Sequence, residues 1–250
     1  MIIDFPKEEH IPGLRALWKE AFGDTDAFLD SFYGQGFSLY RCRCIREKGQ
    51  ILAALYWFDC RWQDKRIAYL YGVATAESHR GQGLCRKLMD NTQHILLQLG
   101  YSGVVLVPAK PPLFGFYEKL GYRCFGGIRS WNAAAADPIT LTQITHKEYA
   151  ALRKTQLPSD SILQEGALLR FLGSYARFYR GEECLFCCAE DAGKLMVYEL
   201  LGDSHAAPGI CAALGFETGS FRCPGTEPFA MYRSLTGQAE MPGYFAFALD

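Results

Sequence analysis

The sequence lacks the long apolar run that a membrane span requires, because no stretch approaches about 18 consecutive apolar residues. Its beginning, MIIDFPKEEH, has no basic segment followed by an apolar core, so it does not predict a secretory signal. An excess of one charge is also missing, since the formal net charge is −1. These absences argue against a membrane protein and give no reason to expect nucleic acid as a partner.

Closely spaced cysteine pairs are also missing. The chain has 10 cysteines, but none forms the Cys-x2-Cys pair of a zinc site. The tightest clusters, Cys42-Arg-Cys44 and Cys187-Cys188, lie in strand-like stretches, and alternation puts Cys42 and Cys44 on one face. We interpret the cysteines as buried thiols in a reducing compartment, which predicts a cytoplasmic protein without a bound metal.

What the sequence does contain is typical of a globular protein with one or two domains: 49% hydrophobic and 21% charged residues over 250 positions. Its most informative stretch runs from Tyr69 to Leu99 and predicts an apolar strand, a turn with Gly81 and Gly83, and a helix. Residues recur on one face of this helix at helical spacing: Leu84, Leu88, Met89, Thr92, Ile95, Leu96 and Leu99.

The junction between that strand and helix has the chemistry of an anion site. The first backbone N–H groups of a helix have no partner within it, and the helix dipole adds positive charge. Gly81 and Gly83 let the backbone approach a phosphate, and Arg80 and Arg86 add charge. A dinucleotide-binding turn would need a third glycine at Arg86, and a P-loop would need Gly-Lys-Ser/Thr after the second glycine. A diphosphate loop and an ordinary glycine turn remain as interpretations.

The following residues favour the diphosphate loop. A strand at Gly103–Ala109 and a proline-marked break precede LFGFYEKLGYR. Together, a strand ending in Val-Ala-Thr, an Arg-Gly-x-Gly loop, a helix, a strand and Phe-Tyr-Glu-Lys-Leu-Gly-Tyr resemble the GCN5-related N-acetyltransferase (GNAT) superfamily over roughly residues 65 to 130. The resemblance implies that His79–Leu84 forms the loop that binds the pyrophosphate of acetyl-CoA. Cys85 departs from the pattern, since Gly or Ala is usual there.

The resemblance also implies a catalytic arrangement. Tyr117 stands where the family has the general-acid tyrosine that protonates the departing thiolate; without the motif it would be interpreted as a core aromatic. Backbone N–H groups of Val73, Ala74 or Thr75 would bind the charge that develops on the thioester carbonyl. The predicted coenzyme-binding residues are Val73, Ala74, Thr75, Arg80, Gly81, Gln82, Gly83, Leu84, Cys85 and Arg86.

The sequence offers no obvious general base. Many relatives carry a glutamate on the strand before the loop, but Arg66–Val73 contains no acid. Asp59 is a candidate, although an exposed strand-end carboxylate is the simpler interpretation. His79 is expected to order the loop, and Glu118 to point away from Tyr117. Five aromatic residues could line an acceptor pocket or belong to the core: Trp57, Phe58, Trp62, Tyr69 and Tyr71.

The whole chain predicts an α/β protein with a mixed sheet, in which a GNAT fold precedes a second, degenerate GNAT-like half. The predicted boundaries are 1–132 for the coenzyme-binding domain, 133–138 for a linker and 139–250 for the second half. Cys211–Phe216 echoes Tyr117–Tyr122, whereas Gly202–Gly209 lacks the phosphate-loop motif. This tandem order resembles the enhanced-intracellular-survival acetyltransferase family without its third domain.

Other predicted elements follow from periodicity and turn residues. In the first half these are a helix with Leu14, Leu17, Trp18 and Phe22 toward the core, a second helix through Tyr33, and antiparallel strands: Ile11–Phe22, Asp24–Tyr33, Ser38–Arg46, Ile51–Gln63 and Arg66–Thr75. In the second half they are a strand, two helices and three strands: Leu141–Ile144, Lys147–Gln156, Ser161–Tyr175, Phe178–Glu182, Cys184–Glu190 and Leu195–Leu201.

The chain end, Pro242–Asp250, is aromatic and aliphatic up to Leu249, unlike an ordinary polar terminus. Burying each of its large side chains would contribute about 1.5–3 kcal/mol. In the three-domain family that this chain resembles, the terminal carboxylate serves as the base. We therefore predict that the tail docks between the halves, with the side chain or α-carboxylate of Asp250 facing the acceptor amine. The alternative is a tail that completes a sheet elsewhere.

These observations predict an N-acetyltransferase that moves acetyl from acetyl-CoA to a primary amine of a small molecule or peptide, by direct attack in a ternary complex. Two alternatives stay open: a coenzyme A-binding sensor or scaffold without catalysis, and an acyltransferase with another acyl group or a hydroxyl acceptor. The sequence does not predict the oligomeric state.

Overall fold

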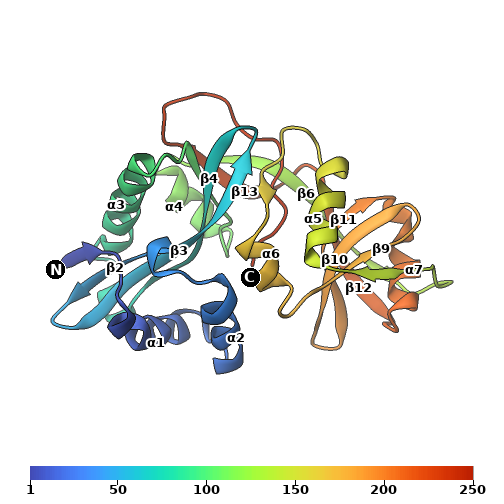
Figure 1. Cartoon of the computed structure of the whole chain (residues 1–250), viewed down its shortest axis with the longest axis horizontal. Helices are drawn as coiled ribbons and strands as arrows, with labels where there is room; N and C mark the ends of the chain where they lie inside the picture. The colour runs from blue at the N-terminus through green and yellow to red at the C-terminus, as the bar shows by residue number, and fades with distance from the viewer. Residues whose placement is uncertain (250) are drawn as a thin grey trace.

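The computed structural model describes residues 1–249, which form one mixed sheet flanked by helices (Figure 1). The 13-stranded sheet has the order β1-β2-β3-β4-β5-β13-β6-β12-β11-β10-β9-β7, and the short β8 pairs with β3. Figure 1 shows the N-terminal half at the left and the C-terminal half at the right, with β6 leading from one to the other.

The first half begins with four antiparallel strands and two helices. The bounds are β1 Ile2–Asp4, α1 Ile11–Phe22, α2 Asp26–Ser31, β2 Cys42–Glu47, β3 Gln50–Trp62 and β4 Lys65–Thr75. Single turns of 3-10 helix lie at Glu8–His10, Leu39–Arg41 and Glu77–His79, and a π-helical turn at Phe32–Gly36. The predicted second helix through Tyr33 is α-helical to Ser31 and continues directly as the π turn to Gly36.

A parallel crossover then follows β4. It consists of α3 (Leu84–Gln98), β5 (Gly103–Leu106) and α4 (Pro112–Glu118), and β5 lies parallel to β4. The strand period of two sends alternate residues to opposite faces. Tyr56 and Tyr69 therefore pack with α1 on one face, whereas Trp57 and Leu70 pack with α3 on the other. Of the residues predicted to face the core from α1, Phe22 is wrong, since it is 45% exposed. Leu99, the last of the periodic positions, follows the end of α3 and is 46% exposed.

The second half repeats this order. Its elements are β6 Arg123–Ala134, β7 Thr142–Ile144, α5 His146–Gln156, β8 Leu163–Gln164, α6 Ala167–Leu172, β9 Arg177–Arg180, β10 Cys184–Asp191, β11 Lys194–Gly202, a 3-10 turn Ser204–Ala206, α7 Ala207–Ala213, β12 Thr218–Pro224 and β13 Glu227–Ser234. The predicted helix Ser161–Tyr175 is wrong over most of its length, because residues 163–164 pair with β3 instead. The strand β6 also extends two residues into the segment predicted as a linker.

The two halves exchange strands. In the first half, β13 pairs antiparallel with β5; in the second half, β6 pairs antiparallel with β12. The strands β6 and β13 also pair with each other and join the halves. The last strand of the chain therefore completes the part of the sheet that carries the predicted coenzyme loop. The sheet continues from one half to the other without a break, so the domain boundaries on either side of the linker at 133–138 stay a prediction.

The internal echo between the halves has a different alignment from the predicted one. Helix α7 connects the parallel strands β11 and β12, as α3 connects β4 and β5. The same closing bond ends α7 (Phe216 N to Cys211 O, 2.9 Å), α3 (Tyr101 N to Leu96 O, 3.0 Å) and α4 (Tyr122 N to Tyr117 O, 3.1 Å), so the strands that each helix connects decide the correspondence. The counterpart of residues 211–216 is therefore 96–101. Within the described residues, the second half has no helix corresponding to α4, which carries Tyr117.

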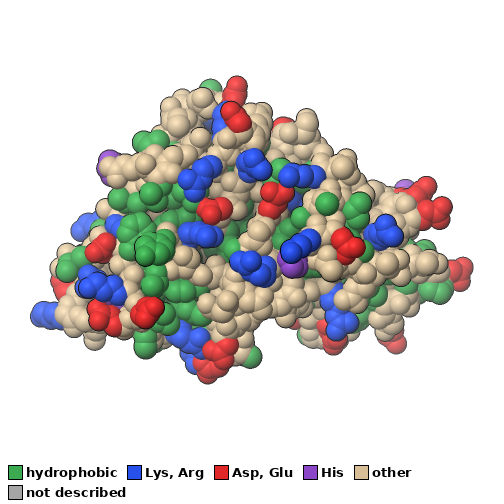
Figure 2. Space-filling model, in the orientation of Figure 1, with side chains coloured by type: hydrophobic (Ala, Val, Ile, Leu, Met, Phe, Trp, Pro, Cys, Tyr) green, Lys and Arg blue, Asp and Glu red, His purple; other side chains and the backbone are tan. Residues whose placement is uncertain are grey.

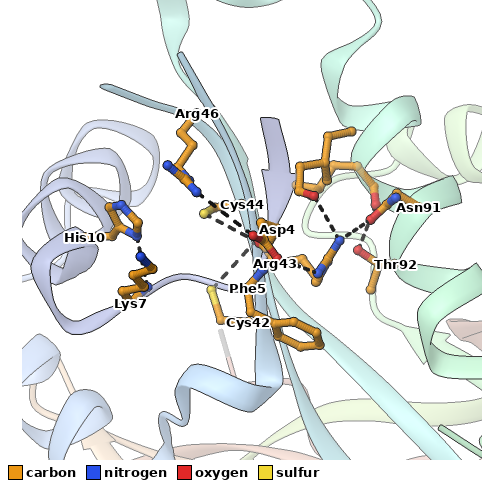
Figure 3. Close-up of polar contacts among 12 residues, drawn as sticks. Asp4, Phe5, Lys7, His10, Cys42, Arg43, Cys44, Arg46, Asn91 and Thr92 are labelled. Carbon is orange, nitrogen blue, oxygen red and sulfur yellow. Dashed lines mark hydrogen bonds and ion pairs between the residues drawn. The ribbon is translucent and has the colours of Figure 1, made fainter. Parts of the chain in front are cut away.

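Arg43 ties the first strands to α3, and through it to the loop at the start of that helix (Figure 3). Its Nη2 donates to Asn91 Oδ1 at 2.6 Å and to the carbonyl of Ile3 at 3.2 Å. Its guanidinium also lies 3.6 Å from Asp4 and over the ring of Phe5. This contact fixes α3 against β1 and β2.

No helix in the described part of the chain is both long and apolar enough to cross a membrane. The face shown in Figure 2 mixes positive and negative side chains rather than gathering one sign.

Candidate active site

A gap opens in the sheet where β4 leaves β5. The parallel pairing ends at Tyr69 opposite Val105, although β4 continues to Thr75. On its other side β4 stays paired with β3, with a bulge that sets Gly72 and Val73 against one residue of β3. The edge of residues 70–75 that faces the gap therefore has no strand partner. Of the predicted oxyanion donors, Val73 lies in the bulge and lines the gap, whereas Ala74 and Thr75 lie opposite Ala54 and Ala53 of β3.

Gly72 makes this bulge possible. Its φ is +58°, and an added Cβ would lie 2.7 Å from Trp18 Cζ3. We expect Gly72→Ala to destabilise the protein by about 2–4 kcal/mol, because left-handed strain and overpacking add. The control Gly34→Ala, where no atom lies within 4 Å, should stay close to wild type. Urea unfolding measures both, and equal midpoints for the two variants would contradict this role of the bulge.

The predicted coenzyme loop follows β4 and leads into α3. Gly81 and Gly83 both have φ +76°, and an added Cβ at either would meet nothing within 4 Å. Gly83 is the N-cap of α3, no side chain caps the first turn, and that turn contains no acidic residue. The open surface, the uncapped amides and the positive end of the helix dipole fit a diphosphate.

The other predicted loop residues take different positions. Arg80 turns back toward β4, with Nε 3.3 Å from the Thr75 carbonyl and an ion pair to Glu77 at 3.8 Å. Gln82 Nε2 donates to Ser78 O at 3.4 Å, which closes the loop. Arg86 is exposed, whereas Leu84 is buried. Cys85 is half-buried, and burial raises the pKa of its thiol to about 11.

A cavity of about 370 Å³ occupies the gap beyond the pairing of β4 with β5. Its volume lies within the range of small-molecule sites, about 300–1,000 Å³. Residues from six parts of the chain meet in its walls: the end of α1 and the turn after it, Phe28 of α2, β4, the segment from β5 to α4, Tyr175 after α6, and the chain end. Tyr117, Val73 and Leu249, which are far apart in sequence, line this one cavity.

Tyr117 lies on α4 and is 8% exposed. Burial raises the pKa of its hydroxyl well above the usual value, with a smaller contribution from Cys85. Its ring contacts Phe116 and Tyr122, and within residues 1–249 no group hydrogen-bonds its hydroxyl. A neutral phenol at the wall of a cavity is a proton donor that keeps its proton at neutral pH.

The chain end runs between the two halves as a buried segment. Residues 244–249 are each at most 4% exposed. Gln164 brackets Phe247 from the second half, donating to its carbonyl at 2.9 Å and accepting from its N–H at 3.0 Å. From the first half, the Tyr69 hydroxyl accepts a hydrogen bond from Leu249 N at 3.3 Å. The segment thus reaches the cavity at Leu249, and Asp250, the predicted base, lies outside the described residues.

The other candidate bases do not line the cavity. The carboxylate of Asp59 accepts a hydrogen bond from Tyr101 and is paired with Arg41 at 3.5 Å and Arg66 at 3.9 Å. His79 contacts Ser78 within the loop, and Glu118 is exposed. Of the five aromatic residues considered for an acceptor pocket, Tyr69 and Tyr71 line the cavity. The other three, Trp57, Phe58 and Trp62, are core residues at most 2% exposed.

Asp24 is the cavity residue that sequence reasoning missed. It follows α1 and lines the cavity, and its Oδ2 accepts a hydrogen bond from Trp18 Nε1 at 2.7 Å. In the sequence it looked like part of the cap of α2, whose actual N-cap is Thr25. Only the fold, which places the end of α1 beside the β4 bulge, identifies Asp24 as a cavity residue.

The equivalent region of the second half is filled by side chains. There β11 leaves β12 after Val197, and Glu199 just beyond is 0% exposed. Arg153 binds Glu199 through Nε at 2.6 Å and Nη2 at 3.0 Å, and the hydroxyls of Tyr149 and Tyr244 donate to the same carboxylate. Tyr244 belongs to the chain end, so the segment that reaches the first cavity also fills the second gap. Among residues 1–249, no group of three His, Cys, Asp or Glu side chains could hold a metal.

Comparison with known proteins relates this fold to acetyltransferases. The family model described as "Acetyltransferase (GNAT) domain" matches residues 3–125. No curated protein matches the sequence. A GCN5-related N-acetyltransferase from Kribbella flavida has a similar structure, with a TM-score of 0.71 and 18% identity, covering 94% of this chain and 71% of that one.

Two further solved structures share the arrangement of both halves. Eis1 from Mycobacterium abscessus has a TM-score of 0.67 and 11% identity, with 96% of this chain and 75% of that one covered. A putative acetyltransferase from Pyrococcus horikoshii has a TM-score of 0.61 and 15% identity, with 98% and 94% covered. These structural similarities establish the fold, which is a GNAT fold followed by a degenerate GNAT-like half. Residues 3–125 therefore form a GNAT acetyltransferase domain.

Proposed function

We propose that the protein is an N-acetyltransferase that moves acetyl from acetyl-CoA to a primary amine by direct attack in a ternary complex. The observation that carries the proposal is the shared cavity of Tyr117, the β4 bulge and the chain end. The reaction needs a proton donor for the departing thiolate, backbone N–H groups for the charge on the carbonyl oxygen, and a carboxylate that takes the proton of the amine. Tyr117, the β4 bulge and the chain end are our candidates for these three parts.

In this proposal the coenzyme is held by residues already described. The amides of Gly81–Arg86 bind the pyrophosphate, and the pantetheine follows the free edge of β4 toward the cavity. The open surface at Gly81 and Gly83 and the uncapped first turn of α3 support this assignment.

The proposed chemistry needs three proton transfers. An amine is mostly protonated near neutral pH, so the ammonium first loses a proton to a carboxylate, for which we propose Asp250 or its α-carboxylate. The nitrogen then forms a bond to the thioester carbon, and the carbonyl charge is bound by N–H groups of Val73–Thr75. As the carbon–sulfur bond breaks, Tyr117 gives its proton to the sulfur. The nitrogen, which became positively charged on attack, releases its second proton through solvent, and that proton restores the Tyr117 hydroxyl. The products are an N-acetyl amine and coenzyme A.

A variant of the loop tests the coenzyme assignment. Gly83→Asp puts a carboxylate at the start of α3, where it repels the diphosphate and caps its amides. We expect acetyl-CoA affinity to fall about 100-fold or more, measured by calorimetry. The control Gly34→Ala should bind as wild type does. Unchanged affinity of Gly83→Asp, or two coenzymes bound per chain, would contradict the single-loop assignment.

Release of free thiol from acetyl-CoA, measured with and without a panel of primary amines, tests the reaction itself. We expect release that depends on the amine, with an N-acetyl product of matching mass. Binding of acetyl-CoA without release would favour the coenzyme-binding module instead.

A further inference from the structure

We infer that the acceptor is a primary amine with a single positive charge and an aromatic body, and that Asp24 binds its ammonium group. This inference rests on the proposed function and names its substrate class. It follows from the walls of the cavity, which combine one carboxylate with aromatic and aliphatic side chains.

The charge balance of the cavity fits one ammonium group. Asp24 is the only charged residue among the described residues of the lining. Its Oδ2 is bound by Trp18, and no described residue hydrogen-bonds or ion-pairs with its Oδ1. Lys19, the nearest lysine in sequence, is paired with Asp26 at 2.5 Å. An uncompensated carboxylate attracts a cation, and among the described walls a polyamine would find no second anionic side chain; the Asp250 carboxylate that we propose as the base takes the proton of the same ammonium group.

Trp18 places this carboxylate near the proposed reaction centre. The six-membered ring of its indole faces Gly72, where an added Cβ would lie 2.7 Å from Cζ3. At the other end of the same indole, Nε1 donates to Asp24. Asp24 is thus one indole length from the β4 bulge. An ammonium group bound there lies in the same cavity as the backbone that would hold the thioester carbonyl.

Exposed aromatic rings at the edge of the cavity provide the second observation. Phe22 is 45% exposed and Tyr175 is 36% exposed, and both line the cavity. Phe28 lies between this edge and the interior, with its ring centroid 6.1 Å from Tyr175 and 6.4 Å from Trp18. An aromatic ligand body would cover these rings and stack on them, which a small hydrophilic amine cannot do.

An acceptor panel tests the substrate class. We compare 2-phenylethylamine, ethanolamine and spermidine by coenzyme A release at one pH. We expect kcat/KM for 2-phenylethylamine to exceed both others by about 30-fold or more, because burial of the phenyl ring stabilises the bound state by the free energy that corresponds to this ratio. A higher kcat/KM for spermidine or ethanolamine would overturn the inference and leave acetyl transfer intact.

Calorimetric titration of 2-phenylethylamine into the coenzyme A complex separates binding from turnover. Saturable binding supports the inference, and it does so even if no amine of the panel releases coenzyme A, a result that would contradict the proposed function. Absence of binding would overturn the inference.

The role of Asp24 is tested by removing its charge alone. Asp24→Asn keeps an oxygen acceptor for Trp18 Nε1, so the indole stays in place. We expect KM for 2-phenylethylamine to rise about 10-fold or more, through loss of a charge-assisted contact, while inhibition by the neutral 2-phenylethanol stays unchanged.

The matched control is Asp26→Asn, which makes the same change two residues later on a side chain paired with Lys19 and Arg15. Its KM should stay within about twofold of wild type. An unchanged KM for Asp24→Asn, or an equal loss of 2-phenylethanol binding, would overturn the role of Asp24.

Discussion

Replacing Tyr117 with phenylalanine should lower kcat about 100-fold or more while acetyl-CoA affinity stays the same. The change removes one hydroxyl and little volume. The ring contacts with Phe116 and Tyr122 can therefore persist. If Tyr117 is the acid, the departing thiolate loses its proton donor, and the effect appears in turnover rather than in binding. Single-turnover kinetics and calorimetry measure the two separately.

The control for this variant is Tyr122→Phe. Tyr122 lies on the same side of the sheet, is 2% exposed, and accepts a hydrogen bond from Gln93 at 2.9 Å. Losing that hydroxyl should lower stability without a comparable loss of kcat. Because burial raises the pKa of Tyr117, its proton is retained as pH rises, so the wild-type rate should show no loss from this group below about pH 10. Equal rates for wild type and Tyr117→Phe would make Tyr117 a core residue.

Deleting Leu249 and Asp250 should lower turnover about 100-fold or more while acetyl-CoA affinity is retained. The deletion withdraws the terminal carboxylates from the end of the segment that Gln164 and Tyr69 hold in place. It also removes the side chain of Leu249, which is 4% exposed. Some loss of stability, about 1.5–3 kcal/mol, is therefore expected from packing alone.

The matched control for the deletion is Leu249→Ala, which loses most of the same packing but keeps both carboxylates of the terminal residue. It should unfold more easily than wild type and still turn over at a comparable rate. Full activity of the deletion variant would show that another group takes the proton. Equal losses of activity in both variants would mean that Leu249 acts through packing.

Local patterns in the sequence predicted the parts of the fold that local physics determines. The boundaries of α1 match the prediction, because Gly23 in a left-handed conformation ends the helix. The predicted coenzyme loop and α3 also follow a local pattern, with glycines before a periodic helix. The buried chain end could be predicted because its apolar residues had no other role.

The parts that were missed depend on contacts between distant residues. Pairing of β13 with β5 joins residues 103–106 to residues 231–234, and no local pattern encodes such a partner. Residues 163–164 form a strand because β3 offers an edge there, which overrides their helical pattern. Asp24 was missed as a cavity residue for the same reason. The residues that surround it in the cavity, such as those at the Gly72 bulge, are distant from it in sequence.

A crystal structure of the full chain with coenzyme A tests the central claim most directly. The account predicts one coenzyme per chain, with its pyrophosphate on the amides at the start of α3. Its sulfur should lie in the gap between β4 and β5, within direct or one-water reach of the Tyr117 hydroxyl. A coenzyme bound at the second half, or a sulfur outside the cavity lined by Tyr117, Val73 and Leu249, would contradict the account.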